Sequence, residues 1–235
     1  MEFSLYLLIL LTEWVLLVTV SAPLFFAGRF TKTPNLGLWL WFLALGSAVV
    51  ATALAFGFAS YSIFETWLRL QESEDLFFIL VASIAPWLLL GFSGILIALA
   101  NQRLGPLFEV AKRYAPVLEQ VSREVSRYRR ATVYELDVPG YLAITKDRDI
   151  FLSKATFELP DKQLEAILRH EYGHIKLGHE KLKQFAYLIY QLFPWFVASR
   201  ALVSEVDRLV ELSADKYALK RVYSKDLNQA RALFS

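Results

Sequence analysis

The chain has 235 residues, of which 56% are hydrophobic, 15% are aromatic and 20% are charged. This composition is too apolar for an ordinary water-soluble domain and indicates residence in a membrane. The net charge of +2 excludes a broadly basic surface for direct binding of nucleic acid, and the absence of cysteine excludes disulfides and thiolate metal ligands.

Three nearly charge-free runs predict transmembrane helices, at about residues 5–20, 36–58 and 76–100. Each is close to the roughly 20 residues that a helix needs to cross a bilayer, so we expect residues 1–100 to form a membrane domain. The first run has Glu2 in place of the basic leader of a signal peptide, so it is expected to remain as a helix. Glu13 lies within it, either as a functional carboxylate or as a group packed between helices.

Lysine and arginine residues near these runs predict the orientation. The first loop holds Arg29 and Lys32, the second loop is mainly acidic, and the segment after the third run holds Arg103, Lys112 and Arg113. Basic segments favour the cytoplasmic side. We expect a multi-pass protein of the cell membrane, in which the first loop and the chain from residue 101 onward are cytoplasmic.

Residues 101–235 carry most of the charge and predict a second, cytoplasmic domain outside the apolar runs. Apolar residues at helical spacing predict a long helix over residues 101–130. Three short segments of alternating polarity predict strands, at residues 132–138, 141–145 and 149–153. Pro160 and Asp161 then open a helix that leads directly into a cluster of histidines.

The segment RHEYGHIKLGHE, residues 169–180, contains all three histidines of the chain. On a helix, His170 and His174 lie one turn apart on the same face, where two neutral imidazoles can bind one Zn²⁺. Glu171 lies about 100° around the helix. That position keeps it off the metal and lets it act as the general base for a water molecule. Gly173 leaves room beside the metal or relieves helix packing.

A catalytic zinc commonly has three protein ligands, so one more is required. Glu211 and Asp215 again lie one helical turn apart. We expect Glu211 to bind the metal and Asp215 to accept a hydrogen bond from a ligating histidine; the alternative is a solvated acidic helix face. His179 would lie about 140° beyond His174 on a continuous helix, which favours a capping or supporting role over metal binding.

A fourth apolar run, residues 185–203, lies between the histidines and Glu211 and is interrupted by Pro194. A single crossing of the bilayer would separate Glu211 from its metal. We therefore predict a re-entrant or interfacial helical hairpin, or a core helix pressed on the membrane. The expected fold is a mostly α integral membrane protein with a cytoplasmic α+β domain of the zincin type.

The combination of His170-Glu171-x-x-His174 with Glu211-x-x-x-Asp215 resembles the motifs of the gluzincin membrane peptidases. The segments LFPWFVASR and ELSAD are most similar to the antirepressor peptidases of the penicillin-resistance sensors. The segment HEYGHIKLGHE is similar instead to the heat-shock (HtpX-type) and CAAX prenyl proteases, which are the second choice. The resemblance covers about residues 100–220.

This resemblance implies a zinc endopeptidase that uses Glu171 as general base at the cytoplasmic face of the lipid bilayer. In the antirepressor relatives the substrate is a DNA-binding repressor, whereas the second branch implies quality control of membrane proteins. A third alternative is a non-catalytic membrane scaffold with structural zinc. The oligomeric state is left open.

The resemblance also implies a place for the substrate. In gluzincins the strand before the zinc helix borders the cleft, so we expect the substrate to pair with an edge strand at Ile150, Phe151 and Leu152. Three residues are candidates for stabilising the oxyanion of the reaction: Tyr172, Arg208 and Tyr217.

Overall fold

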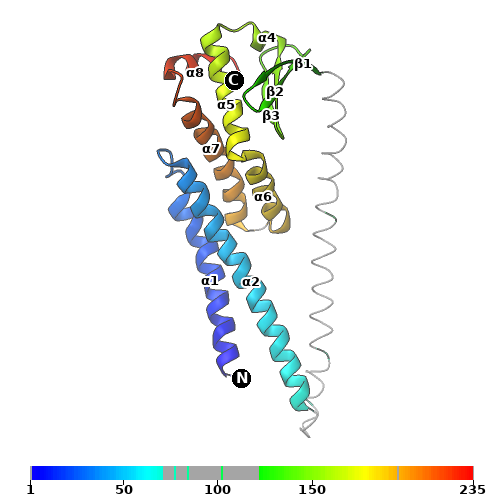
Figure 1. Cartoon of the computed structure of the whole chain (residues 1–235). Helices are drawn as coiled ribbons and strands as arrows, with labels where there is room; N and C mark the ends of the chain where they lie inside the picture. Colours follow the sequence, from blue (N-terminus) through cyan, green and yellow to red (C-terminus); the bar gives the residue numbers. More distant parts are fainter. Residues whose placement is uncertain are drawn as a thin grey trace.

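The computed structural model describes residues 2–70, 122–194 and 196–234, together with positions 77, 84 and 102. These residues form a mostly helical structure with one small mixed sheet (Figure 1). The helices are α1 (Glu2–Phe26), α2 (Pro34–Leu70), α4 (Lys154–Phe157), α5 (Asp161–Leu177), α6 (His179–Leu192), α7 (Val197–Ala218) and α8 (Ser224–Arg231). The strands are β1 (Ser122–Tyr128), β2 (Ala131–Leu136), β3 (Ala143–Lys146) and β4 (Asp149–Ser153).

The helices α1 and α2 form an antiparallel hairpin (Figure 1). Each contains a window long and apolar enough to cross a membrane, Ile9–Phe26 and Pro34–Tyr61. Only 11% and 17% of these windows is buried, so most of their apolar side chains face outward, which favours insertion into a bilayer. The third predicted run, residues 76–100, lies outside the continuous ranges that the structure describes.

The helical hairpin and the C-terminal helices share one apolar core. Trp41 of α2 is fully buried there among side chains of α1, α6 and α7. The turn between α1 and α2 is also tied to α7. The Gly28 N–H donates to the Glu205 carboxylate at 3.1 Å, and the Lys216 ammonium group donates to the Lys32 carbonyl at 3.1 Å. The hairpin therefore fixes the position of α7.

The sheet has the strand order β1-β2-β4-β3. β1 pairs antiparallel with β2 across a tight turn in which Arg129 adopts φ 58°. The prediction of a helix up to residue 130 is therefore wrong for residues 122–130. This segment is polar and gains its stability from pairing with the buried strand β2.

The sheet order also corrects the expected substrate strand. β4 pairs with β2 on one side and with β3 on the other, so both of its edges are occupied. Ile150, Phe151 and Leu152 are accordingly buried and cannot pair with a substrate. The edge strand next to β4 is β3, which packs against α5.

The fourth apolar run, residues 185–203, does not form one helix. It is divided between α6 and α7, which meet at a turn around Pro194 and pack against each other as a hairpin. Both ends of the run therefore lie on the same side, and α7 returns to pack against α5 (Figure 1). The hairpin was one of the predicted forms; its association with a membrane stays a prediction.

Candidate active site

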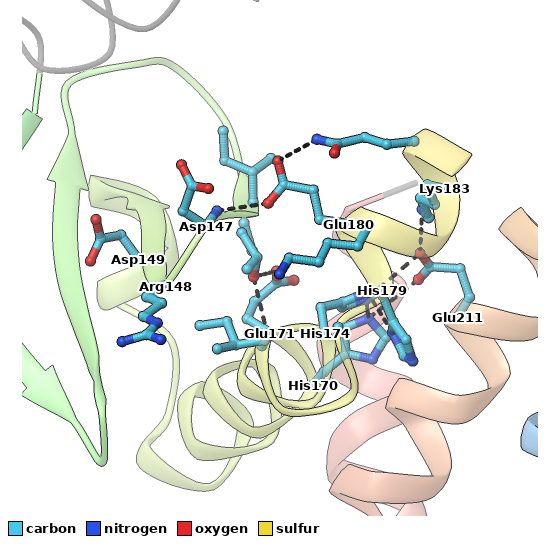
Figure 2. Close-up of a pocket in the computed structure, with 17 residues that line it drawn as sticks. Asp147, Arg148, Asp149, His170, Glu171, His174, His179, Glu180, Lys183 and Glu211 are labelled. Atoms are coloured by element: carbon cyan, nitrogen blue, oxygen red, sulfur yellow. Dashed lines mark hydrogen bonds and ion pairs between the residues drawn. The ribbon is translucent and has the colours of Figure 1, made fainter. Parts of the chain in front are cut away.

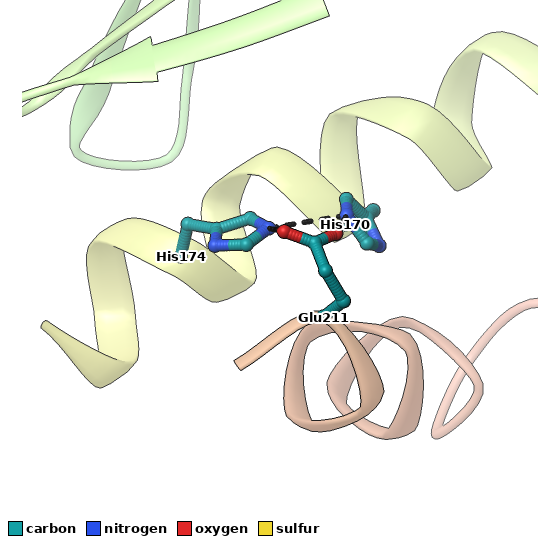
Figure 3. A group of neighbouring side chains, drawn as sticks. All are labelled: His170, His174 and Glu211. Atoms are coloured by element: carbon teal, nitrogen blue, oxygen red, sulfur yellow. Dashed lines mark hydrogen bonds and ion pairs between the residues drawn. The ribbon is translucent and has the colours of Figure 1, made fainter. Parts of the chain in front are cut away.

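Two histidines of α5 and one glutamate of α7 meet between these helices (Figure 3). The Nε2 atoms of His170 and His174 are 3.1 Å apart. The Glu211 carboxylate lies 3.3 Å from Nε2 of His170 and 3.7 Å from Nε2 of His174. The structure thus brings the three predicted metal ligands together around one point.

The donor atoms and their spacing fit a zinc ion. Ligand atoms about 2.0–2.1 Å from a tetrahedral zinc are about 3.3 Å from one another, close to the observed 3.1, 3.3 and 3.7 Å. Two imidazoles and one carboxylate are also a ligand set of catalytic zinc, which keeps its fourth position open. His170, His174 and Glu211 can therefore hold Zn²⁺.

Opposite charges stabilise one another within this cluster. Burial lowers the pKa of His170, but hydrogen bonds to Asp215 and Glu211 outweigh this effect and raise the pKa to about 9. Burial raises the pKa of Glu211, but hydrogen bonds from His170 and His174 outweigh it and hold that pKa well below its usual range. The cluster consequently attracts a positive charge, either a proton or a cation.

Asp215 lies one turn after Glu211 on α7 and orients His170. Nδ1 of His170 donates to the Asp215 carboxylate at 2.9 Å, which turns Nε2 toward the cluster. Asp215 also accepts a hydrogen bond from Arg231 of α8, whose guanidinium lies 3.8 Å from the Glu211 carboxylate. The expected contact of Asp215 with a histidine is present, and Arg231 is a support that the sequence did not reveal.

His174 is oriented by the third histidine. Nδ1 of His179 lies 3.0 Å from Nδ1 of His174, so one ring donates to the other. Burial, followed by the neighbouring His174, lowers the pKa of His179 to about 3. His179 is not one of the three converging donors, but the expected reason is wrong. α5 ends at Leu177, and Gly178, with φ 67°, turns the chain directly into α6.

Gly173 permits the close contact of α5 with α7. A Cβ atom at this position would lie 3.3 Å from the backbone of Ala214 and 3.3 Å from the ring of Tyr217. Ala214 is three residues after Glu211 on α7, so this contact sets how near Glu211 comes to the histidines. Of the two roles considered from the sequence, helix packing is the one that the structure supports.

Glu171 is buried and lies in the same cleft, but outside the three-donor cluster (Figure 2). The hydroxyl of Thr145 on β3 lies 2.6 Å from the Glu171 carboxylate and donates to it. Sequence reasoning missed Thr145, because no local spacing connects it to the zinc helix. The predicted strands and their order before the helix contain no information on which residue of β3 faces α5.

The cleft that contains these groups has a volume of about 900 Å³ (Figure 2). The edge strand β3 lines it with Ala143, Ile144 and Thr145. Lys183 of α6, 3.3 Å from the Glu211 carboxylate, adds positive charge beside the cluster. The three residues proposed as oxyanion donors are not among its lining residues: Tyr172, Arg208 and Tyr217.

One comparison with known proteins matches the region that contains this site. A family model described as Peptidase family M48 matches residues 139–234, which span β3 to α8. The matched segment contains every residue of the three-donor cluster together with Glu171 and Asp215. It indicates a metallopeptidase domain of the gluzincin type. It does not distinguish the antirepressor peptidases from the HtpX-type and CAAX prenyl proteases. No curated protein matches the chain.

Replacement of Gly173 tests the helix contact. We expect Gly173→Leu to push α7 away from α5 and to weaken zinc binding by about 5- to 150-fold, since overpacking of this kind costs roughly 1–3 kcal/mol. Gly57→Leu on α2 is the matched control, because a Cβ there meets nothing within 4 Å. Competition with a chromophoric chelator measures the zinc affinity. Equal affinity in both variants would contradict the role of this contact.

Thr145→Val tests the support of Glu171. A hydrogen bond to a charged group contributes about 1.5–3 kcal/mol, so loss of the hydroxyl should lower kcat on an unfolded, fluorophore-labelled protein by roughly tenfold or more. KM and zinc content should stay the same, and Thr145→Ser should restore kcat. A fall in zinc content, or no rescue by serine, would point to a purely structural role.

Proposed function

We propose that the chain is a membrane-embedded zinc endopeptidase that hydrolyses peptide bonds of a protein substrate. The observation that carries this proposal is the convergence of two imidazole nitrogens and one carboxylate, with a separate buried carboxylate in the same cleft. The match to Peptidase family M48 over the same elements supports it. His170, His174 and Glu211 would hold the metal.

The residues of the chain then have distinct tasks in the reaction. When bound, Zn²⁺ supplies Lewis-acid polarisation of a peptide carbonyl and lowers the pKa of water. Glu171 accepts a proton from the attacking water as general base and can return it to the leaving amine. Thr145 holds the carboxylate of Glu171 in place, and Asp215 keeps His170 in the tautomer whose Nε2 carries the free electron pair.

The edge strand β3 is the proposed binding strand for the substrate. An extended peptide can add to its outer edge through backbone hydrogen bonds. Because Thr145 of β3 donates to Glu171, a peptide paired with this strand lies beside the general base. β3 thus takes the role that the sequence had suggested for β4.

Two substrate classes follow from the resemblance. The first is a cytoplasmic regulatory protein such as a DNA-binding repressor, and the second is a set of damaged membrane proteins. Cells that carry the wild-type chain or Glu171→Gln separate them by proteomics. One stabilised repressor in the variant supports the first class, and many stabilised membrane proteins support the second.

The metal ligands are tested by the zinc content of purified protein. We expect one zinc per wild-type chain and almost none in His170→Ala or Glu211→Ala, because two remaining donors bind zinc weakly. Asp207→Ala is the matched control, since Asp207 lies one turn before Glu211 and pairs with Lys183 outside the donor cluster. Retention of zinc in Glu211→Ala would mean that the third ligand is another residue.

The general base is tested by Glu171→Gln. The amide cannot accept the proton, so the rate of peptide hydrolysis should fall about 10²–10⁴-fold while zinc content stays at one per chain. Cleavage of the labelled unfolded protein in detergent measures the rate. An unchanged rate, or a zinc-loaded wild type that cuts nothing, would favour the scaffold with structural zinc.

A further inference from the structure

One hydrogen bond shows how the two apolar windows are aligned along the axis of the α1–α2 hairpin. The Trp14 indole of α1 donates to the Ser47 hydroxyl of α2 at 3.1 Å, so these residues are level. Phe26 lies twelve residues after Trp14, and Asn35 lies twelve residues before Ser47. Since both antiparallel helices rise equally per residue, Phe26 and Asn35 are level. Both windows, Ile9–Phe26 and Pro34–Tyr61, therefore end at one common boundary.

The metal cluster lies at this boundary. The hydroxyl of Ser213 donates to the side-chain oxygen of Asn35, and Ser213 is two residues from Glu211. One turn of α7 before Ser213, the side chain of Leu209 would lie 3.0 Å from a Cβ on Gly37 of α2. The first turn of α2 is thus in contact with the turn of α7 that carries Glu211 (Figure 1).

The hairpin of α6 and α7 continues past the boundary alongside α2. The rings of Phe185 and Phe42 are 5.7 Å apart, and Phe42 is seven residues, about 10 Å, beyond Asn35. Val197, at the start of α7, is fourteen residues or about 21 Å before Glu211 along the helix. The tip of this hairpin is the turn between Leu192 and Val197. It therefore reaches the depth of the apolar windows.

The part of the hairpin beyond the boundary is mainly apolar where it faces outward, and Arg200 is the one charged residue exposed there. Val197 is 72% exposed, Phe185 is 51% exposed, and Tyr187 and Phe196 are 39% and 37% exposed. Water would be a poor environment for such a group of side chains, whereas lipid would cover them. The outward face of α1 and α2 at the same level is apolar as well.

The backbone of the turn is also suited to lipid. Non-helical backbone at membrane depth requires internal hydrogen-bond partners. The Ser199 hydroxyl lies 2.6 Å from the Phe193 carbonyl and 2.8 Å from the Phe196 carbonyl. Arg200, the one charged residue in the run 185–203, donates through Nε to the Pro194 carbonyl at 3.0 Å. Three carbonyls at the break between the helices, those of Phe193, Pro194 and Phe196, are thereby satisfied.

We propose that the tip of the α6–α7 hairpin is inserted in the bilayer and holds the metal cluster at the membrane surface. The substrates are then polypeptide segments that directly adjoin a membrane anchor. This substrate class rests on the proposed peptidase function. A segment anchored in the same bilayer is confined to the layer in which the cleft lies, whereas a soluble protein must reach the cleft from bulk solution.

The depth of the tip is measured with single-cysteine variants. Because the chain has no cysteine of its own, the label attaches only at the introduced residue. Full-length Val197→Cys, Leu43→Cys and Tyr223→Cys carry a nitroxide label in vesicles of phosphatidylcholine and phosphatidylglycerol. Collision with oxygen and with a water-soluble nickel chelate reports depth. The label at 197 should be at least as deep as that at 43 on α2, while that at 223 should be aqueous. A label at 197 as accessible to nickel as that at 223 overturns the proposal.

The substrate class is tested with one unstructured tail in two forms, fused to a single transmembrane anchor or free in solution. With zinc-loaded protein in the same vesicles, we expect at least tenfold faster cleavage of the anchored tail. Mass spectrometry should place the first cuts within about ten residues of the anchor, a reach of about 33 Å. Glu171→Gln is the inactive control.

The outcomes separate this proposal from the function on which it rests. Equal rates for the two tails, or first cuts spread along the whole tail, overturn the substrate class and leave the peptidase intact. If the zinc-loaded protein cuts neither tail nor the labelled unfolded protein, the peptidase function itself fails. The depth of the label at 197 then still decides whether the cluster stands at the membrane surface.

Discussion

The close contact between α5 and α7 at Gly173 and Ala214 is the constraint on which the candidate site depends. α5 supplies two donors and α7 supplies one, so neither helix can form the cluster alone. The contact has little tolerance, because a single added carbon at Gly173 already meets the backbone of Ala214. Behind α7, the α1–α2 hairpin fills the remaining space with buried side chains and prevents a sideways shift.

The parts of the site that could be predicted are those set by short-range helical geometry. His170, Glu171 and His174 lie within five residues, so their directions follow from the helix alone. The one-turn spacing of Glu211 and Asp215 likewise predicted which groups would point toward α5. Pro194 indicated the break that lets α7 return to the same side. In each case the controlling interaction is local.

The parts that could not be predicted depend on pairing between distant segments. Strand order decides whether β4 or β3 is the edge, and alternating polarity along one strand contains no information on its neighbours. The hydrogen bond of Thr145 could not be predicted for the same reason, because its partner Glu171 is 26 residues away. β1 was assigned to a helix because its polar sequence becomes a strand only by pairing with β2.

The core shared by the hairpin and the C-terminal helices has a consequence for handling the protein. Trp41 and Leu38 of α2 cover the face of α7 that carries Leu202 and Val206. A fragment limited to the sheet and the later helices would expose this face to water and lose the hydrogen bond to Glu205. Such a fragment would aggregate even though it contains all three converging donors, so recombinant work on the hydrolytic half requires the first two helices and an amphiphile to cover them.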